Sequence, residues 1–117
     1  MISVRRAYDP PDAADGARVL VDRLWPRGVR KDALDLTEWL RDVAPSTELR
    51  RWYGHTPDRS AEFADRYRAE LAHDPAAAAL TTLRRYAAAG PLTLVTAVKD
   101  LDLAHTAVLV RLLDQDG

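Results

Sequence analysis

The sequence predicts a small α/β protein, in which helices pack on a mostly parallel β-sheet. Three apolar segments have the character of strands, at residues 2–6, 19–21 and 92–98. The second is an unbroken Val-Leu-Val run, which is typical of a strand buried on both faces of a parallel sheet. Four helical segments separate it from the third strand, and a last helix follows. Helices that alternate with apolar strands favour parallel pairing, so we expect segments 19–21 and 92–98 to be neighbouring parallel strands.

The strand boundaries follow from alternation and from turn residues. Apolar and polar residues alternate from Ile2 to Arg6, which indicates a strand with one solvated face. The segment Tyr8-Asp9-Pro10-Pro11-Asp12 ends this strand, and Asp15-Gly16 marks a second turn. The second strand leads into a loop at residues 22–28. Lys99-Asp100 leaves the third strand.

Capping residues place the first two helices. Asp35 followed three residues later by Glu38 resembles a capping box and predicts a helix N-terminus. Pro45 would end that helix, Ser46 would cap the next one, and Gly54 would end it. The inward stripe of the first of these helices comprises Leu36, Trp39, Leu40 and Val43.

Two Pro-containing dipeptides predict the following helices. Thr56-Pro57 and Asp74-Pro75 each resemble an N-cap followed by a first helical position, and Gly90 ends the second of these helices. A last helix is expected from about Asp102 to Leu113. The other side chains expected to face the core are Leu49, Trp52, Tyr53, Phe63, Tyr67, Leu71, Leu80, Leu83, Ala87, Ala104, Val108, Leu109 and Leu112. Among the aromatic residues, Trp39, Trp52, Phe63 and Tyr67 should be largely buried.

Length and composition narrow the class of protein. The 117 residues suit one domain, 1–117, with 47% apolar and 30% charged residues. The absence of cysteine excludes disulfides, thiolate metal sites and a cysteine nucleophile, and it suits a reducing compartment. There is no apolar signal core at the N-terminus, and no apolar run is long enough to cross a bilayer. We therefore expect a cytoplasmic protein without membrane contact.

The charge pattern disfavours nucleic acid as a partner. The net charge is −1, although residues 1–31 hold seven Lys and Arg against four Asp, a local excess of +3. Fifteen of the seventeen cationic residues are arginine, which indicates coding bias, so arginine content alone is weak evidence of function. The sequence leaves the oligomeric state open.

Three segments should meet at one edge of the sheet, because ligands of open α/β sheets bind beyond the carboxyl ends of the strands. These segments are Tyr8-Asp9, residues 22–28 and residues 96–100. The last leads into a helix N-terminus, which favours anions. Together with arginines and a lysine, this arrangement predicts a site for a phosphate or a carboxylate.

The middle segment supplies the candidate anion clamp. Arg23 and Arg27 flank Trp25-Pro26, and the Trp25 ring would stack on a planar part of the ligand. The alternative is structural: the arginines would pair with Asp22 or Asp9, and Trp25 would cover the end of a strand. Tyr8, His55 and Thr96 are further candidates for the wall of the ligand site.

Lys99, Asp100 and His105 are the candidate catalytic residues, which would polarise the ligand or move protons. Each also has a structural interpretation. Lys99 and Asp100 suit a solvated strand exit and a helix cap, and His105 lies on the apolar face of the last helix, where a hydrogen-bonded core histidine is common. The three histidines lack metal-ligand spacing, so no metal site is expected. Glycine-rich nucleotide-binding motifs and a nucleophile elbow are missing too, so no cofactor is expected.

Short motifs along nearly the whole chain resemble the YeaO-like family of bacterial domains of unknown function (DUF488). They are Arg18-Val19-Leu20-Val21-Asp22-Arg23-Leu24-Trp25-Pro26-Arg27-Gly28, Trp39-Leu40, Ala44-Pro45-Ser46, Leu49-Arg50, Trp52, Gly54-His55, Phe63, Arg66-Tyr67, Glu70-Leu71, Pro91-Leu92-Thr93-Leu94 and Lys99-Asp100. The undecapeptide from Arg18 is the most specific of them.

The resemblance implies a small α/β fold and no settled activity. Some members carry a tetrapyrrole-methyltransferase label, which this sequence does not support because it has no glycine-rich loop for S-adenosylmethionine. Two departures from the family pattern stand out. Thr96 replaces an expected aromatic residue, and Leu103-Ala104-His105 replaces a stretch usually rich in His and Asn. If those residues carry chemistry in relatives, this chain has altered or lost it.

The favoured interpretation is a small enzyme or binding domain for an anionic metabolite bearing a phosphate, nucleotide or carboxylate group. The alternative is a non-catalytic interaction or regulatory domain, in which the same motifs form a structural corner. A nucleic-acid-binding role is the weakest of the three.

Overall fold

A four-stranded parallel sheet forms the centre of the computed structural model, which describes residues 1–115. The strands are β1 (Ile2–Arg6), β2 (Ala17–Leu20), β3 (Glu38–Trp39) and β4 (Leu92–Thr96), in the order β1-β4-β2-β3. β2 and β4 are adjacent and parallel, with Val19 opposite Leu94 and Leu20 opposite Val95. The predicted fold class and the predicted pairing of these two strands are therefore confirmed.

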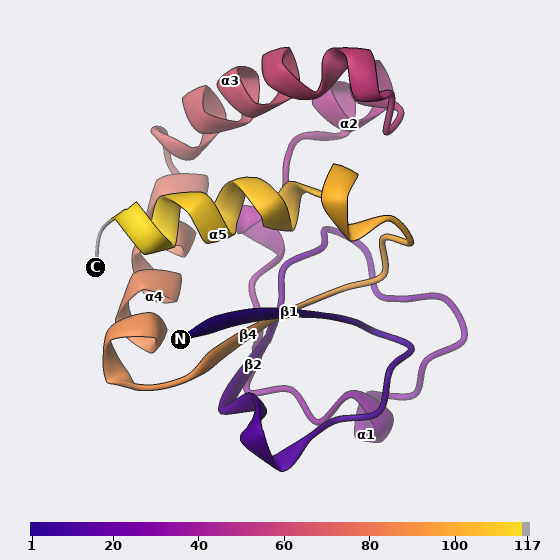
Figure 1. Ribbon diagram of the computed structural model, residues 1–117, viewed down its shortest axis with the longest axis vertical. Helices are drawn as coiled ribbons and strands as arrows, with labels where there is room; N and C mark the ends of the chain where they lie inside the picture. Colours follow the sequence, from indigo (N-terminus) through magenta and orange to yellow (C-terminus); the bar gives the residue numbers. More distant parts are fainter. Residues whose placement is uncertain (116–117) are drawn as a thin grey trace.

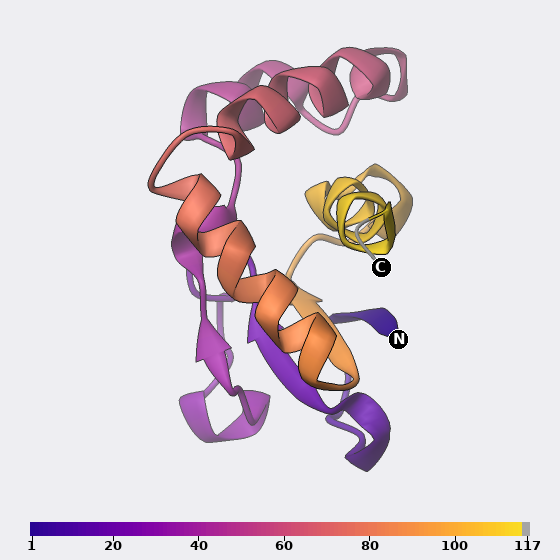
Figure 2. The same cartoon turned by 90° about the vertical axis from the view of Figure 1, so that its left-hand side faces the viewer.

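Within residues 1–115, five α-helices pack around this sheet. Their bounds are α1 (Lys31–Leu34), α2 (Thr47–Tyr53), α3 (Ser60–Leu71), α4 (Ala76–Ala89) and α5 (His105–Gln115). In both views α2 and α3 form an upper layer, α5 lies between that layer and the sheet, and α1 lies at the opposite end (Figures 1 and 2).

The larger core cluster lies where α4 and α5 cover one face of the sheet and α3 packs on these two helices. Val19, Leu94 and Leu109 are completely buried in it. Phe63 stacks on Tyr53 with a centroid distance of 4.1 Å, and the Tyr67 hydroxyl donates a hydrogen bond to the Val43 carbonyl oxygen. Phe63 and Tyr67 are buried as predicted.

The other face of the sheet combines a smaller apolar cluster with a buried ion pair. Leu20, Leu34 and Val95 are buried in the cluster. Beside it, Arg18 Nη1 lies 2.6 Å from Asp15 Oδ2, and the two side chains are only 3% and 4% exposed. Burial raises the pKa of Asp15, but hydrogen bonds from the Asp12 backbone N–H and from Arg18 outweigh it, so the pKa lies below its usual value. The ionised carboxylate is thus part of the folded structure.

The helix predicted from Asp35 is wrong. Asp35 has a left-handed conformation (φ 49°) and follows the end of α1, and Glu38–Trp39 forms the edge strand β3 instead. Extended pairing with β2 overrides the capping pattern, as the Leu40 N–H donates to the Leu20 carbonyl oxygen at 2.9 Å. The four apolar residues of the predicted helical stripe therefore lie on both faces of the sheet. Leu36 and Trp39 join the smaller core cluster, and Leu40 and Val43 join the larger one.

The remaining helix predictions hold with shifted boundaries. Ser46 caps α2 as predicted, its Oγ accepting a hydrogen bond from the Leu49 N–H at 3.1 Å, and Gly54 follows α2 in a left-handed conformation. Thr56-Pro57 leads into a short 3-10 turn, and α3 begins only at Ser60. A second 3-10 turn covers residues 101–103, so α5 begins at His105 rather than near Asp102.

Trp39 and Trp52 are partly buried, whereas Phe63 and Tyr67 are almost completely buried. The outer face of each indole ring is covered by an arginine guanidinium group and not by an apolar side chain. The Arg41 guanidinium carbon lies 4.1 Å from the Trp39 ring centroid, and that of Arg66 lies 4.4 Å from the Trp52 ring centroid. Cation–π packing of this kind lets an indole ring lie near solvent while one face stays covered.

Candidate functional site: an arginine-rich pocket at the strand ends

A pocket with a volume of about 610 Å³ lies beyond the carboxyl ends of β1, β2 and β4. The loop after β2 forms one side, α2 and the residues before it form the other, and residues 97–98 after β4 and the start of α5 contribute the floor. Its lining residues are Tyr8, Asp22, Arg23, Leu24, Trp25, Pro26, Arg27, Ala44, Pro45, Thr47, Arg50, Arg51, Tyr53, His55, Phe63, Ala97, Val98 and His105. This position agrees with the strand-end rule for open parallel sheets.

Asp22 is the anionic residue of the pocket lining, and it ties the end of β2 to the end of β4. Its Oδ1 accepts a hydrogen bond from the Thr96 hydroxyl at 2.7 Å, and its Oδ2 accepts one from the Ala97 N–H at 2.7 Å. The Asp22 side chain is 13% exposed. Two strong bonds therefore hold the carboxylate in one orientation at the floor.

His105 begins α5 and lies behind this carboxylate. Its Nε2 is 2.9 Å from the Val21 carbonyl oxygen and 3.5 Å from Asp22 Oδ1. Burial lowers the pKa of His105, the nearby Asp22 opposes this shift, and the positive charge of Arg50 adds to it; the net pKa lies below the usual value. The ring is thus neutral at pH 7, and Nε2 donates its proton to the carbonyl group of Val21, because a carbonyl can only accept.

Four arginines line the pocket, and they are not equivalent. Arg23 is half-buried, and its guanidinium group donates hydrogen bonds to the carbonyl oxygens of Ala44 (3.0 Å) and Pro45 (3.4 Å). This contact holds the segment before α2 against the loop after β2. Arg27, Arg50 and Arg51 have exposed side chains.

Aromatic rings supply much of the apolar wall. Tyr53 and Phe63 are buried, whereas Tyr8 is 50% exposed and its hydroxyl donates to the Arg27 carbonyl oxygen at 3.3 Å. Trp25 is half-buried, and its Nε1 donates to the Val29 carbonyl oxygen at 2.7 Å. Trp25 therefore packs on the smaller core cluster and lines the pocket as well.

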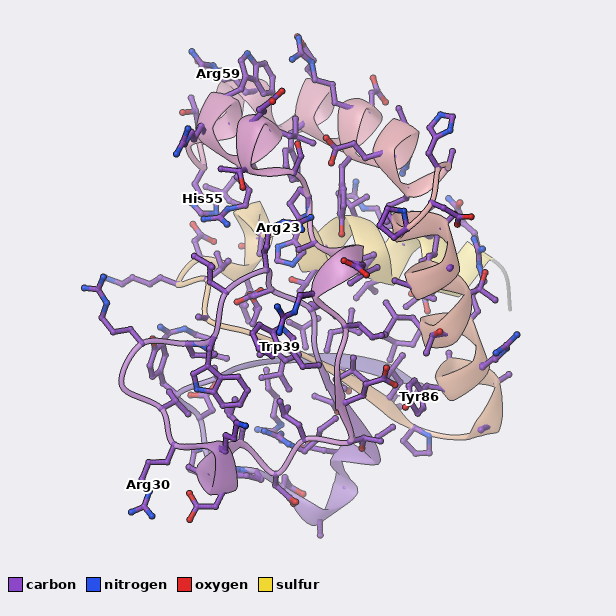
Figure 3. All side chains as sticks on the ribbon, turned by 180° about the vertical axis from the view of Figure 1, so that it is seen from behind. Arg23, Arg30, Trp39, His55, Arg59 and Tyr86 are labelled. Carbon is purple, nitrogen blue, oxygen red and sulfur yellow. The ribbon has the colours of Figure 1, made fainter. Side chains whose placement is uncertain are left out.

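Six of the nine predicted site residues line this pocket: Tyr8, Arg23, Trp25, Arg27, His55 and His105. Figure 3 shows Arg23 and His55 on the same side of the molecule, below α2, and Arg30 far from them near α1. Whether these side chains bind or react with a ligand stays a prediction.

The other three predicted residues do not line the pocket. Thr96 is fully buried behind Asp22, to which its hydroxyl is bonded. Lys99 and Asp100 are exposed, and the Asp100 carboxylate accepts a hydrogen bond from the Asp102 N–H at 3.1 Å as a cap of the following turn. Lys99 and Asp100 are thus not lining residues. Burial raises the pKa of the Tyr53 hydroxyl in the lining, and the negative charge of Asp100 is near enough to help raise it.

Three charged lining residues were not predicted as site residues: Asp22, Arg50 and Arg51. Asp22 belongs to the segment 22–28 that is predicted to reach the site, but the only role predicted for it is an ion pair with Arg23 or Arg27, although a polar residue directly after a buried strand is a usable signal. The two arginines lie on α2, and no local motif indicates which helix will lie over the strand ends. Tertiary packing alone places them there.

Within residues 1–115, no group of three His, Cys, Asp or Glu side chains is arranged to hold a metal ion. None of the helices in the same range has the length and apolar character needed to cross a bilayer.

Fold and pocket together define a small parallel α/β protein with a cationic pocket at the carboxyl edge of its sheet. The chain belongs to the DUF488 family: the model described as the inactive DUF488-N3 subclade matches residues 1–116.

Relatives in other bacteria are similar over almost the full chain. The uncharacterised protein Rv3073c of Mycobacterium tuberculosis is 50% identical over 113 residues, which cover 97% of this chain and 93% of the relative. The uncharacterised protein YeaO of Escherichia coli is 44% identical over 110 residues, 92% of each chain. The resemblance to the YeaO-like family is therefore confirmed. No solved structure is significantly similar to the chain.

Proposed function

We propose that this protein is a non-catalytic binding domain for a small organic anion, which it takes up in the pocket at the strand ends. The observation that carries the proposal is the charge of the lining: four arginines stand against the single carboxylate of Asp22. The whole chain has a net charge of −1, so this excess is local to the pocket. Guanidinium groups bind phosphates and carboxylates through paired, charge-assisted hydrogen bonds.

Size and wall chemistry support an organic ligand rather than an inorganic ion. A volume of about 610 Å³ lies within the range of small-molecule sites, which is roughly 300–1,000 Å³. Trp25, Tyr53 and Phe63 add apolar surface. A metabolite with an anionic group and a carbon skeleton would use both kinds of wall.

The state of His105 supports binding without catalysis. A general base needs a free lone pair within reach of the ligand's proton. With its proton on Nε2 and directed to the Val21 carbonyl oxygen, the neutral His105 ring has its lone pair on Nδ1, and a side chain only 8% exposed gives a ligand little access to it. Lys99 and Asp100 lie outside the lining, so we assign no catalytic step to them. The description of the matching subclade as inactive agrees with this proposal.

Arg50→Gln and Arg30→Gln form a matched pair for testing the proposal. Both remove one positive charge from an exposed arginine, but only Arg50 lines the pocket, whereas Arg30 pairs with Asp32 on the surface. Thermal unfolding and calorimetry with phosphate, ribose 5-phosphate, AMP and citrate at moderate salt would identify a ligand. A ligand at a hundred times its dissociation constant adds about 2.7 kcal/mol of stability. That corresponds to roughly 10 °C in melting temperature for a domain of this size.

We expect Arg50→Gln to weaken binding about tenfold or more, since a hydrogen bond to a charged group is lost, and Arg30→Gln to leave the affinity unchanged. Equal losses in both variants would indicate nonspecific charge attraction. If none of the anions binds, the interaction-domain alternative becomes the better explanation. Binding of duplex DNA with a steep salt dependence would favour the nucleic-acid alternative. A cytoplasmic location is part of the proposal and is supported by the lack of cysteine.

A further inference from the structure

We propose that the ligand carries a hydroxyl group that donates a hydrogen bond to the Asp22 carboxylate, in addition to the anionic group that binds the arginines. This inference rests on the proposed function and specifies its ligand class: a hydroxylated phosphate or carboxylate, such as a sugar phosphate.

The first argument is the unused hydrogen-bonding capacity of Asp22. An ionised carboxylate offers about four acceptor positions. The Thr96 hydroxyl and the Ala97 N–H occupy two of them, one on each oxygen. The side chain is 13% exposed and lines the pocket, so the remaining positions are open to a ligand there.

The second argument is that no cation neutralises Asp22. The neighbouring Arg23 is directed to the carbonyl oxygens of Ala44 and Pro45 instead. His105 Nε2 is 3.5 Å from Asp22 Oδ1, and its shorter contact is with the Val21 carbonyl oxygen. The Asp22 carboxylate therefore has no Lys or Arg partner among the described residues.

These two facts divide the pocket into an anion-binding and a donor-binding part. The ligand's anionic group is repelled by Asp22 and attracted by Arg50 and Arg51 on α2. The ligand atoms beside Asp22 must donate, because an apolar group there would displace water from a charged acceptor without replacing its hydrogen bonds. Four arginines against one carboxylate disfavour an ammonium donor, so a hydroxyl group is the better match.

Ribose 5-phosphate and pentyl phosphate are suitable probes, because they share the phosphate and a five-carbon skeleton but differ in hydroxyl groups. Their dissociation constants are measured by calorimetry with the wild-type protein, Asp22→Asn and Arg50→Gln. We expect the wild type to prefer ribose 5-phosphate by about tenfold or more, as for a hydrogen bond to a charged group. Asp22→Asn should lose most of this preference, and Arg50→Gln should weaken both ligands while the preference persists.

The possible results separate this inference from the proposed function. Equal affinity of the wild type for both phosphates, or tighter binding of pentyl phosphate, would overturn the hydroxyl contact but leave the anion pocket standing. A preference for ribose 5-phosphate that is unchanged in folded Asp22→Asn would do the same. Failure of both phosphates to bind overturns this inference, and the proposed function falls with it if AMP and citrate fail to bind as well. If Asp22→Asn does not fold, the wild-type comparison decides alone, extended by 2-deoxyribose 5-phosphate as a probe of intermediate hydroxyl content.

Discussion

Replacing Asp22 with asparagine tests whether this carboxylate holds the strand ends together. The amide side chain would keep one oxygen acceptor for either the Ala97 N–H or the Thr96 hydroxyl, both of which lie 2.7 Å from the present carboxylate. A hydrogen bond to a charged group contributes about 1.5–3 kcal/mol, against about 0.5–1.5 for a neutral pair. The change from two charged bonds to neutral ones should cost about 2 kcal/mol. For a chain of this length that is roughly 8 °C in melting temperature.

Urea unfolding at pH 7, followed by circular dichroism, measures this loss, and the m-value shows whether the transition stays comparable. Asp65→Asn is the control, because Asp65 is an exposed carboxylate on α3 and its neutralisation should change stability by less than about 0.5 kcal/mol. Thr96→Val removes one of the two donors, so the double variant should lose less than the sum of the single losses, with a coupling of about 1 kcal/mol. The anchoring role would be refuted if Asp22→Asn folds and its free energy of unfolding lies within about 0.5 kcal/mol of the wild-type value. A difference of that size is on the order of the error of additivity.

Further predictions concern the core, the loop contact and two titrating groups. Phe63→Ala removes a buried ring and should cost about 3–5 kcal/mol, so the melting temperature should drop steeply or the protein should not fold. Arg23→Ala should destabilise the ligand-free protein by about 1.5 kcal/mol in urea unfolding, because two carbonyl groups lose their donor. The pKa of buried His105 is lowered, so its contribution to stability is present above pH ~6.5 and lost as the pH falls through the folded pKa; His105→Gln should flatten this part of the profile. The pKa of Asp15 is also lowered, so Asp15→Asn should be less stable at pH 7 and should lose less stability than the wild type on acidification below pH ~4.

Much of the fold was predictable because local patterns and tertiary packing agree. The Val19–Val21 run is buried on both faces, and that requirement selects an unbroken apolar sequence. Ser46 and Gly54 mark the two ends of α2. A side-chain cap and a left-handed residue satisfy the free backbone groups at the helix ends, and this effect does not depend on the rest of the fold. Phe63 and Tyr67 share one helical face, so their burial followed from spacing alone.

The candidate site was predictable only in part, because its position follows from a topological rule but its composition follows from packing. Tyr8, Arg23 and Trp25 follow strands directly, so the rule that ligands bind at strand ends located them. Arg50 and Arg51 come from a helix whose place over the strand ends has no local signature. Lys99 also follows a strand, yet the turn after β4 leaves it exposed and outside the lining.

By itself, the sequence determined three of the four strand runs, the two ends of α2 and the edge of the sheet where a pocket would form, since each depends on residues close together in the chain. Only the tertiary structure decided that Glu38–Trp39 is an edge strand, because its hydrogen-bond partner β2 lies about twenty residues away and outweighs a local capping pattern. Only the tertiary structure, too, joined Asp22 to Thr96 and His105. Residues that are 74 or more positions apart leave no pattern in a single sequence that shows their contact. These contacts form because parallel strands bring residues from distant parts of the chain to the same edge of the sheet.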